Sequence, residues 1–113
     1  MTEGNSALSL AGPESLAIYN ALLTSLREIG DYQVEVKKTS IHLVRKTAFA
    51  GVHPRRQYLV LTIKAAQPIA RARIAKAEQV SKNRWHLDVK LTSLEQIDAE
   101  LIAWLREAYA LCA

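Results

Sequence analysis

The three histidines and the single cysteine are the residues whose side chains could serve catalysis or hold a metal ion. His42, His53 and His86 are separated by 11 and 33 residues, so no two of them have the close spacing of a zinc ligand pair. Cys112 is next to the C-terminus and is expected to fray, and the sequence has no Gly-x-Ser-x-Gly nucleophile motif. These residues predict no enzyme, no cofactor and no metal site. One alternative stays open, since His42 and His86 could meet on a sheet face if their strands pair.

Lysines and arginines form a larger group with a possible chemical role, because they can bind phosphate or another anion. Residues 31–90 carry thirteen Lys and Arg against four Asp and Glu, a net charge of +9, whereas residues 1–30 carry −2 and residues 91–113 carry −3. The basic charge is therefore concentrated in the middle of the chain. The candidate anion-binding residues are Lys37, Lys38, Arg45, Lys46, Arg55, Arg56, Lys64, Arg71 and Arg73.

The composition is typical of one soluble domain. The chain has 113 residues, of which 50% are hydrophobic and 23% charged, enough for a single hydrophobic core. No apolar run approaches the roughly 20 residues that cross a bilayer, and the N-terminus lacks the features of a signal peptide. A single cysteine cannot form an internal disulfide, so we expect a cytoplasmic protein that does not contact a membrane. Residues 1–11 are small and polar and are expected to form a flexible tail.

A first helix is predicted after this tail. Gly12 can cap it, Pro13 suits its first turn, and Gly30 is placed to end it in a left-handed conformation. The apolar side chains recur three and four positions apart, which indicates one buried stripe with Leu23 in its middle. The stripe consists of Leu16, Tyr19, Leu22, Leu23, Leu26 and Ile29.

The periodicity then changes to two, which predicts strands. Apolar and polar residues alternate around 34–36, 41–44 and 59–63, and 48–52 is a more apolar run, while 53–57 reads as a turn around Pro54. Such closely spaced strands favour an antiparallel meander. The clearest alternation is at 85–91, where Trp85 is expected to be buried and His86 exposed. Segment 65–84 is ambiguous, with a short helix around 69–78 or a basic loop as its alternatives.

A last helix is predicted from Ser93, because Gln96 three residues later completes a capping box. Leu101 lies in the middle of its apolar stripe and is expected to be in the core. These elements predict the α+β class: a single domain over residues 12–113, mainly an antiparallel sheet of about five strands, with the N- and C-terminal helices packed on one face. The opposite face would then carry basic side chains and one aromatic residue, Tyr58.

Several of these segments resemble a family of small bacterial domains of unknown function, DUF5655. The resemblance covers residues 13–109 and is carried by the Tyr19 region, by Val-Lys-Lys-Thr-Ser-Ile at 36–41, by Phe-Ala-Gly-Val at 49–52 with its basic turn, by Leu-Thr-Ser at 91–93, by Asp-Ala-Glu-Leu at 98–101 and by Glu-Ala-Tyr at 107–109. It implies a fold and a domain boundary. It supplies no catalytic residues.

Two functions are compatible with the sequence. The first is a non-catalytic binding domain that takes an anionic partner, with nucleic acid as the leading case, on a basic sheet face. The second is a protein-interaction or accessory domain that does not bind nucleic acid. One contiguous positive face would favour the first, and basic residues scattered among carboxylates would favour the second.

Overall fold

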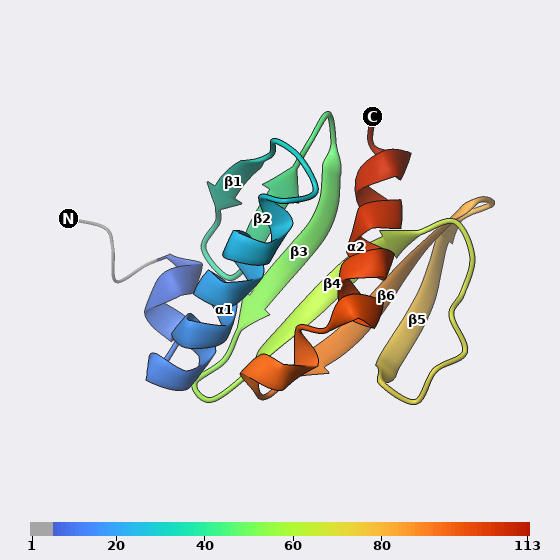
Figure 1. Cartoon of the computed structure of the whole chain (residues 1–113). Helices are drawn as coiled ribbons and strands as arrows, with labels where there is room; N and C mark the ends of the chain where they lie inside the picture. The colour runs from blue at the N-terminus through green and yellow to red at the C-terminus, as the bar shows by residue number, and fades with distance from the viewer. Residues whose placement is uncertain (1–5) are drawn as a thin grey trace.

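A computed structural model describes residues 6–113 of the chain. Within these residues, six strands form one antiparallel sheet and two α-helices pack on the same face of it (Figure 1). The strands are β1 (Gln33–Val36), β2 (Ile41–Val44), β3 (Ala48–Pro54), β4 (Leu59–Ala65), β5 (Ile74–Ser81) and β6 (Arg84–Leu91), and the helices are α1 (Pro13–Leu26) and α2 (Ala99–Leu111). The predicted α+β class and the placement of both helices are confirmed. The sheet has one strand more than expected.

The strand order across the sheet is β1-β2-β3-β4-β6-β5. Strands β1 to β4 form the predicted meander, in which each strand pairs with the next. Strand β6 lies between β4 and β5 and pairs antiparallel with both. Strand β5 must therefore run in the same direction as β4, and the segment 66–73 travels the length of the sheet to reach its start (Figure 1).

Alternate side chains of the central strands form the core against the two helices, as their period of two requires. The cross-strand partners Ile41 and Val52, and Leu61 and Val89, are all fully buried. Helix α2 packs over β3 and β4, with Leu101 fully buried beneath it, as expected. The other sheet face is left without a covering helix, and we call it the open face.

Helix α1 buries a slightly different stripe from the predicted one. Gly12 is its N-cap and Pro13 its first residue, as expected. Its buried side chains follow Ile18, Leu22 and Leu26 at intervals of four, so Leu23 is only half-buried and the expectation that it lies in the core is wrong. The helix also ends at Leu26 rather than at Gly30, which has a φ of 159° and follows a turn.

The first described residues are more ordered than the tail predicted over 1–11. Residues 7–10 form a short 3-10 helix, η2 (Ala7–Leu10), and Ala7 is fully buried. The Ala7 N–H donates to the Lys37 carbonyl over 2.8 Å, and the Gly12 N–H donates to the Arg56 carbonyl over 3.0 Å. These bonds attach the segment to two turns of the sheet, so the expectation of a flexible tail is wrong for residues 6–11. Residues 1–5 lie outside the described part of the chain.

The ambiguous segment 65–84 contains a strand, which corrects both alternatives considered for it. Strand β5 is the edge of the sheet, and almost all of its side chains are exposed. A strand with both faces in solvent needs no apolar alternation, so its alanines and charged residues resemble a helix in sequence. Pairing with β6 through the turn at Lys82 and Asn83 holds it extended, and two register shifts interrupt the pairing.

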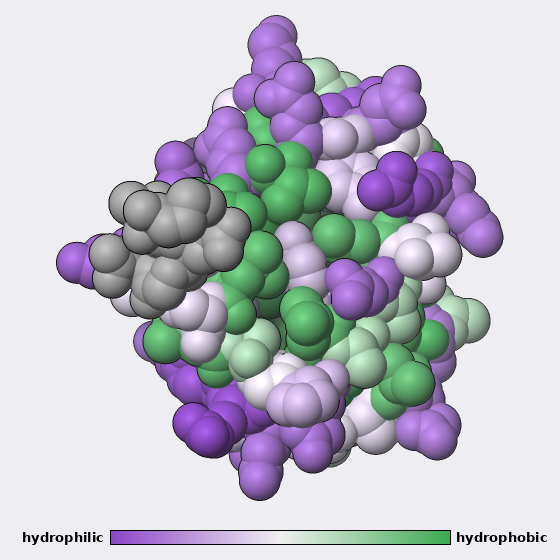
Figure 2. Space-filling view, turned by 90° about the vertical axis from the view of Figure 1, so that its left-hand side faces the viewer, coloured by the Kyte–Doolittle hydropathy of each residue, from purple (hydrophilic) through white to green (hydrophobic). Residues whose placement is uncertain are grey.

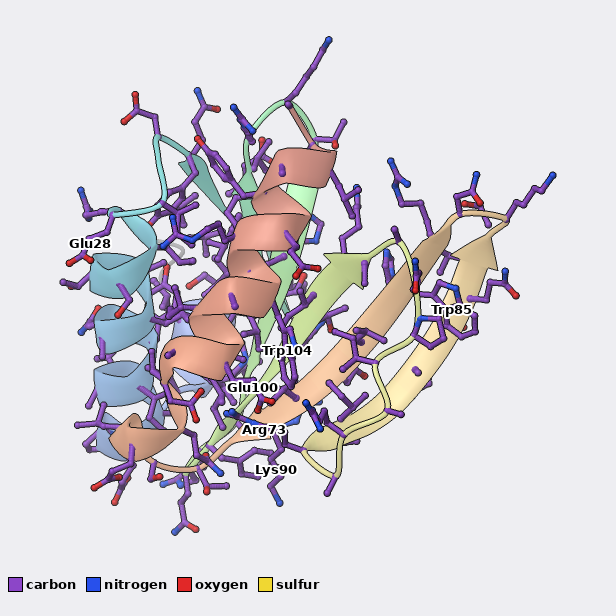
Figure 3. All side chains as sticks on the ribbon, turned by 45° about the vertical axis from the view of Figure 1, so that its right-hand side comes forward. Glu28, Arg73, Trp85, Lys90, Glu100 and Trp104 are labelled. Atoms are coloured by element: carbon purple, nitrogen blue, oxygen red, sulfur yellow. The ribbon has the colours of Figure 1, made fainter. Side chains whose placement is uncertain are left out.

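Trp85 and the start of the last helix also differ from expectation. Trp85 and His86 are both half-buried, whereas Trp85 was expected to be buried and His86 exposed. Trp85 lies near the tip of the β5–β6 hairpin, away from α2, and Trp104 lies beneath that helix (Figure 3). The Ser93 capping box is present, but it caps a 3-10 turn, η3 (Leu94–Gln96). Helix α2 starts later, with Asp98 as its N-cap, because the Asp98 carboxylate accepts the Leu101 N–H.

The C-terminal cysteine is held in place rather than frayed. Cys112 directly follows α2 and only 4% of its surface is exposed. Its carbonyl accepts the Lys46 N–H over 3.2 Å, which ties the end of α2 to the β2–β3 turn.

Candidate functional site

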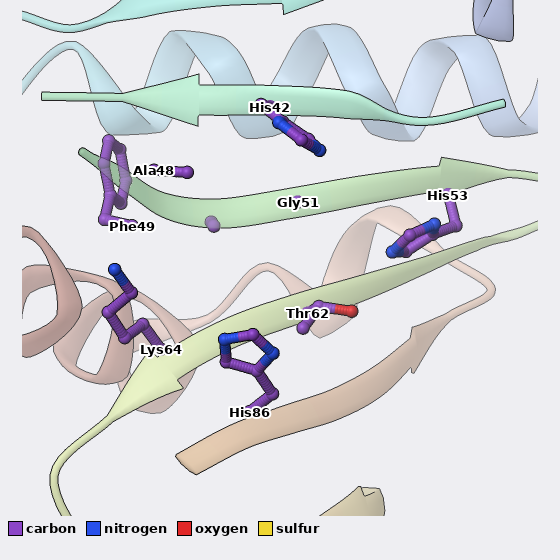
Figure 4. A pocket seen from close by; sticks show the side chains of 9 residues that line it. His42, Ala48, Phe49, Gly51, His53, Thr62, Lys64 and His86 are labelled. Atoms are coloured by element: carbon purple, nitrogen blue, oxygen red, sulfur yellow. The ribbon is translucent and has the colours of Figure 1, made fainter. Parts of the chain in front are cut away.

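A hollow of about 280 Å³ lies on the open face of the sheet, and all three histidines of the chain line it (Figure 4). We call it the histidine hollow and define it by six of its lining residues. They are His42, Gly51, His53, Thr62, Lys64 and His86.

Cross-strand register brings these residues together from four strands. His42, Gly51 and Thr62 are direct neighbours in one row across β2, β3 and β4. Lys64 and His86 are partners in the next row, across β4 and β6. His42 and His86 therefore reach the same hollow although β2 and β6 do not pair. His53, expected in a turn, lies within β3, two residues after Gly51 and on the same face.

A β-bulge explains why the face is hollowed at this place. Leu43 pairs with Ala50 and Val44 pairs with Ala48, so one extra residue, Phe49, is inserted in β3. Phe49 is buried with its ring edge-on to Tyr109 of α2, so both 49 and 50 turn toward the helices. Ala48 and Gly51 are then the β3 residues of this stretch that alternate onto the open face, and Phe49 and Ala50 line the hollow only from its helix side (Figure 4).

Lys64 is the cation of the hollow, and it is half-buried. Among residues 6–113, no carboxylate lies within ion-pair distance of its ammonium group. Asp88 lies on the same face, but it accepts the Thr62 hydroxyl over 2.7 Å. A half-buried cation without a protein counter-ion can gain more from an anionic ligand than a fully solvated one, because its charge is less screened by water.

The imidazole rings are available for hydrogen bonding to a ligand. Ser40 Oγ lies 3.5 Å from His42 Nε2, while the rings of His53 and His86 have no hydrogen-bond partner within residues 6–113. Burial lowers the pKa of His53 below its ordinary value; the Asp88 carboxylate acts against this shift. A neutral imidazole offers one donor and one acceptor. Among residues 6–113, no three His, Cys, Asp or Glu side chains are grouped so that they could hold a metal ion.

The nine candidate anion-binding residues are not brought together into one cluster. Lys37 and Lys38 lie in the β1–β2 turn, at the same end of the sheet as Arg55 and Arg56 in the β3–β4 turn. Because turns of a meander alternate between ends, the β2–β3 turn lies at the opposite end. Only Lys64 lines the hollow.

The β2–β3 turn is tied to helix α2. The guanidinium of Arg45 lies 4.1 Å from the Tyr109 ring centroid and donates to the Tyr109 carbonyl over 3.1 Å. The neighbouring Lys46 is exposed. Arg45 therefore has a structural contact that accounts for its position.

Arg71 and Arg73 form ion pairs with carboxylates at the start of α2. Figure 3 shows Arg73 beside Glu100. Arg71 Nε lies 3.3 Å from a Glu100 oxygen, and Arg73 Nη1 lies 2.9 Å from Asp98 and 3.2 Å from Glu100. Arg73 also donates to the Gln96 carbonyl over 2.6 Å. These two arginines attach the segment 66–73 to the helix side and do not belong to the open face.

The pKa shifts agree with this structural role. Partial burial opposes the charge of Arg73, but hydrogen bonds to Asp98 and Glu100 outweigh it and raise the pKa of the guanidinium. The Leu101 N–H and then Arg73 lower the pKa of the Asp98 carboxyl.

Replacing Arg73 with glutamine is expected to lower the free energy of unfolding by about 1–3 kcal/mol, because hydrogen bonds to charged groups are lost together. Arg71→Gln is the matched control; the Arg71 side chain is 64% exposed with one ion pair, so the loss is about 0–1 kcal/mol. Chemical denaturation measures both. Equal losses of stability for the two variants would contradict this assignment.

Sequence reasoning found the histidines as a group but missed the residue that forms the floor. Gly51 was placed only within the apolar run 48–52, with no role of its own. The available signal was Phe49-Ala50-Gly51, three consecutive residues that break the alternation of β3 and mark the bulge.

The fold and the hollow together define a class: a small α+β domain with an open antiparallel sheet face that carries a preformed, histidine-lined site. The chain belongs to the DUF5655 family, a domain of unknown function, whose family model matches residues 6–111. Comparisons with curated proteins and with solved structures gave no match. Helices able to cross a membrane are not found among residues 6–113.

Proposed function

We propose that this domain is a non-catalytic binding module that takes an anionic partner, with nucleic acid as the leading case, on the open face of its sheet. The observation that carries the proposal is Lys64, a half-buried cation that lines a preformed hollow and has no carboxylate partner among residues 6–113. A cytoplasmic location is part of the proposal. It is supported by the single cysteine, which cannot form a disulfide within the chain.

Charge around the hollow supports an anionic partner of some length. Residues 31–90 carry a net charge of +9, and four of their cations are exposed in the two turns at one end of the sheet. They are Lys37, Lys38, Arg55 and Arg56. A nucleic-acid strand that crosses the open face from the hollow to these turns would contact both Lys64 and the four cations of the turns. Tyr58 and Lys90 lie between these places, with the Lys90 ammonium 4.3 Å from the Tyr58 ring centroid.

The test is fluorescence anisotropy with labelled DNA and RNA, single-stranded and duplex, at two or more salt concentrations. Binding to phosphates releases counterions, so about three to five contacts on duplex DNA give a log–log slope of about −3 to −4.5. Little sequence preference is expected from phosphate contacts, which carry no sequence information directly. Absence of binding to any of these probes at micromolar concentration in low salt would reject nucleic acid as the partner.

Charge reversal of Arg55 and Arg56 together is expected to weaken binding and make the salt slope shallower by about one to two, since each lost phosphate contact removes about 0.9. Folding should persist, because both side chains are exposed and the backbone groups of both residues keep their hydrogen bonds; the change removes one side-chain hydrogen bond, from Arg55 Nη1 to the Pro54 carbonyl.

The matched control reverses Arg27, which directly follows α1, and Arg106 of α2, two exposed arginines on the helix side of the sheet. Both double variants change the net charge equally, so any difference in salt slope between them must come from where the reversed arginines lie. Equal weakening by the two would mean that only the overall charge attracts the partner.

The alternative is a protein-interaction domain that does not bind nucleic acid, and two observations favour it. Basic residues lie at both ends of the sheet, and Glu35, Glu78 and Asp88 are interspersed on its strands. Apolar side chains also gather on the side of the molecule that η2, α1 and β1 form (Figure 2). The exposed large apolar residues of these three elements are Leu8, Leu10, Leu16, Val34 and Val36. An edge strand such as β1 can pair with an extended segment of another protein.

A further inference from the structure

We propose that the histidine hollow holds one unpaired nucleotide, with its base over Gly51 and its phosphate at Lys64. This inference rests on the proposed function and deepens it, because it assigns a ligand to a specific site. It also predicts that the domain prefers single strands to duplexes, since a base within a duplex is stacked and paired and cannot enter a hollow in a sheet.

The shape of the hollow fits a flat group. Its floor is the β3 backbone at Gly51, and its walls come from side chains on β2, β4 and β6 (Figure 4). Its volume of about 280 Å³ lies just below the roughly 300–1,000 Å³ of pockets for drug-sized ligands, so it suits a single ring system rather than a larger molecule. Imidazole rings can stack on a base as other aromatic side chains do.

The polar groups of the hollow complement a nucleotide. His53 and His86, without partners among residues 6–113, each offer a donor and an acceptor when neutral, and base edges carry both kinds of group. Lys64 supplies a point charge for the phosphate. The Asp88 carboxylate would repel a phosphate that came close to it, but Asp88 does not line the hollow and is held by the Thr62 hydroxyl, which donates to it over 2.7 Å.

A larger side chain in place of Gly51, at the floor of the hollow, would occupy the space proposed for the base. A Cβ added to Gly51 would approach only His53 Nε2 at 3.8 Å, an ordinary contact, and Gly51 does not have a positive φ. Gly51→Val should therefore fold, with a melting temperature equal to or above that of the wild type, because valine favours strands. It is expected to weaken binding of a short labelled single strand by about tenfold or more, since the stacking of one base is lost.

The salt slope separates the hollow from the rest of the face. Gly51→Val removes no charge, so its slope should equal that of the wild type while its affinity falls. Gly51→Ala, which adds one methyl group, should give a smaller loss in the same direction. If Gly51→Val folds and binds the single strand as tightly as the wild type, the hollow does not hold a base.

Lys64→Gln tests the phosphate contact, and Lys82→Gln is its matched control. Lys82 lies in the exposed turn between β5 and β6 and does not line the hollow. Lys64→Gln should bind the single strand more weakly than Lys82→Gln. Equal binding by the two variants would show that Lys64 does not contact the phosphate.

Two further probes distinguish a free nucleotide from a unit of a strand. A nucleoside monophosphate and inorganic phosphate are added separately while backbone amide NMR shifts are followed at Gly51 and Thr62. The nucleoside monophosphate should shift both signals in the wild type and not in Gly51→Val, and inorganic phosphate should shift them less. Equal shifts with both ligands would reduce the site to a phosphate site and overturn the assignment of the base. If nucleic acids fail to bind but the nucleoside monophosphate still shifts these signals, the proposed function fails while the hollow keeps its ligand.

Discussion

Replacing Leu101 with alanine is expected to lower the free energy of unfolding by about 2–5 kcal/mol, the usual range for a large-to-small change in a core. Leu101 is fully buried where α2 packs over β3 and β4. Alanine has the highest helix propensity, and the Leu101 N–H that caps the helix through Asp98 is kept, so the loss reports packing alone. Chemical denaturation with an unchanged m-value measures it.

Leu23→Ala is the informative comparison, because both residues lie in helices and both were expected in the core. Leu23 is only half-buried, so a smaller loss of about 1–2 kcal/mol is expected. Losses of equal size would mean that α1 is rotated on the sheet, with Leu23 rather than Leu22 facing the core.

Elements with one exposed face and one buried face could be predicted from the sequence, because their apolar residues recur with the period of a strand or of a helix. Strands β2 to β4 and the alternation of β6 were found in this way. Strand β1 was found from the same alternation although all of its residues are exposed, and the start of α1 was found from Gly12 and Pro13. The errors lie where the asymmetry is weak. In the alternation of β6, Trp85 is on the same side as the buried residues, but it lies at the end of a hairpin that extends beyond α2. The alternation in a sequence does not show how far along the strand a helix covers that side.

Strand β5 could not be predicted because its conformation is imposed by its partner. Its sequence, Ile-Ala-Lys-Ala-Glu-Gln-Val-Ser, combines alanines and charged residues and lacks alternation. The exposed Val80 adds little, since an edge strand is held mainly by backbone bonds to β6. Local propensity for such a segment is weak, and tertiary pairing decides the outcome.

The candidate site illustrates the same limit. The histidine spacings of 11 and 33 say nothing about proximity, because cross-strand register and not chain distance brings His42, His53 and His86 to one hollow. The sequence also did not show which lysines and arginines form ion pairs with carboxylates. Arg73 and Lys64 are both basic residues near strand ends, yet one is engaged by α2 carboxylates and the other faces the hollow.

Gly30 is the position where we expect the second large effect on stability, because Tyr109 of α2 lies directly against it. A Cβ at Gly30 would contact the Tyr109 hydroxyl and lie 2.8 Å from its Cζ, too close for van der Waals contact. The ring cannot easily move away. Its hydroxyl donates to the Asp31 carbonyl over 2.7 Å, its edge packs on Phe49 with the centroids 5.3 Å apart, and Arg45 stacks on it.

Gly30→Ala is therefore expected to lower the free energy of unfolding by about 1–3 kcal/mol, the usual cost of overpacking. A double-mutant cycle with Tyr109→Leu tests the cause. Leucine removes the hydroxyl and the ring atoms that the new methyl group would meet, so Gly30→Ala should cost much less in the Tyr109→Leu background, with a coupling energy of about 0.5–3 kcal/mol. Chemical denaturation of the four proteins gives this energy. Additivity of the two changes would show that Gly30 is required for its own backbone conformation and not for the approach of Tyr109.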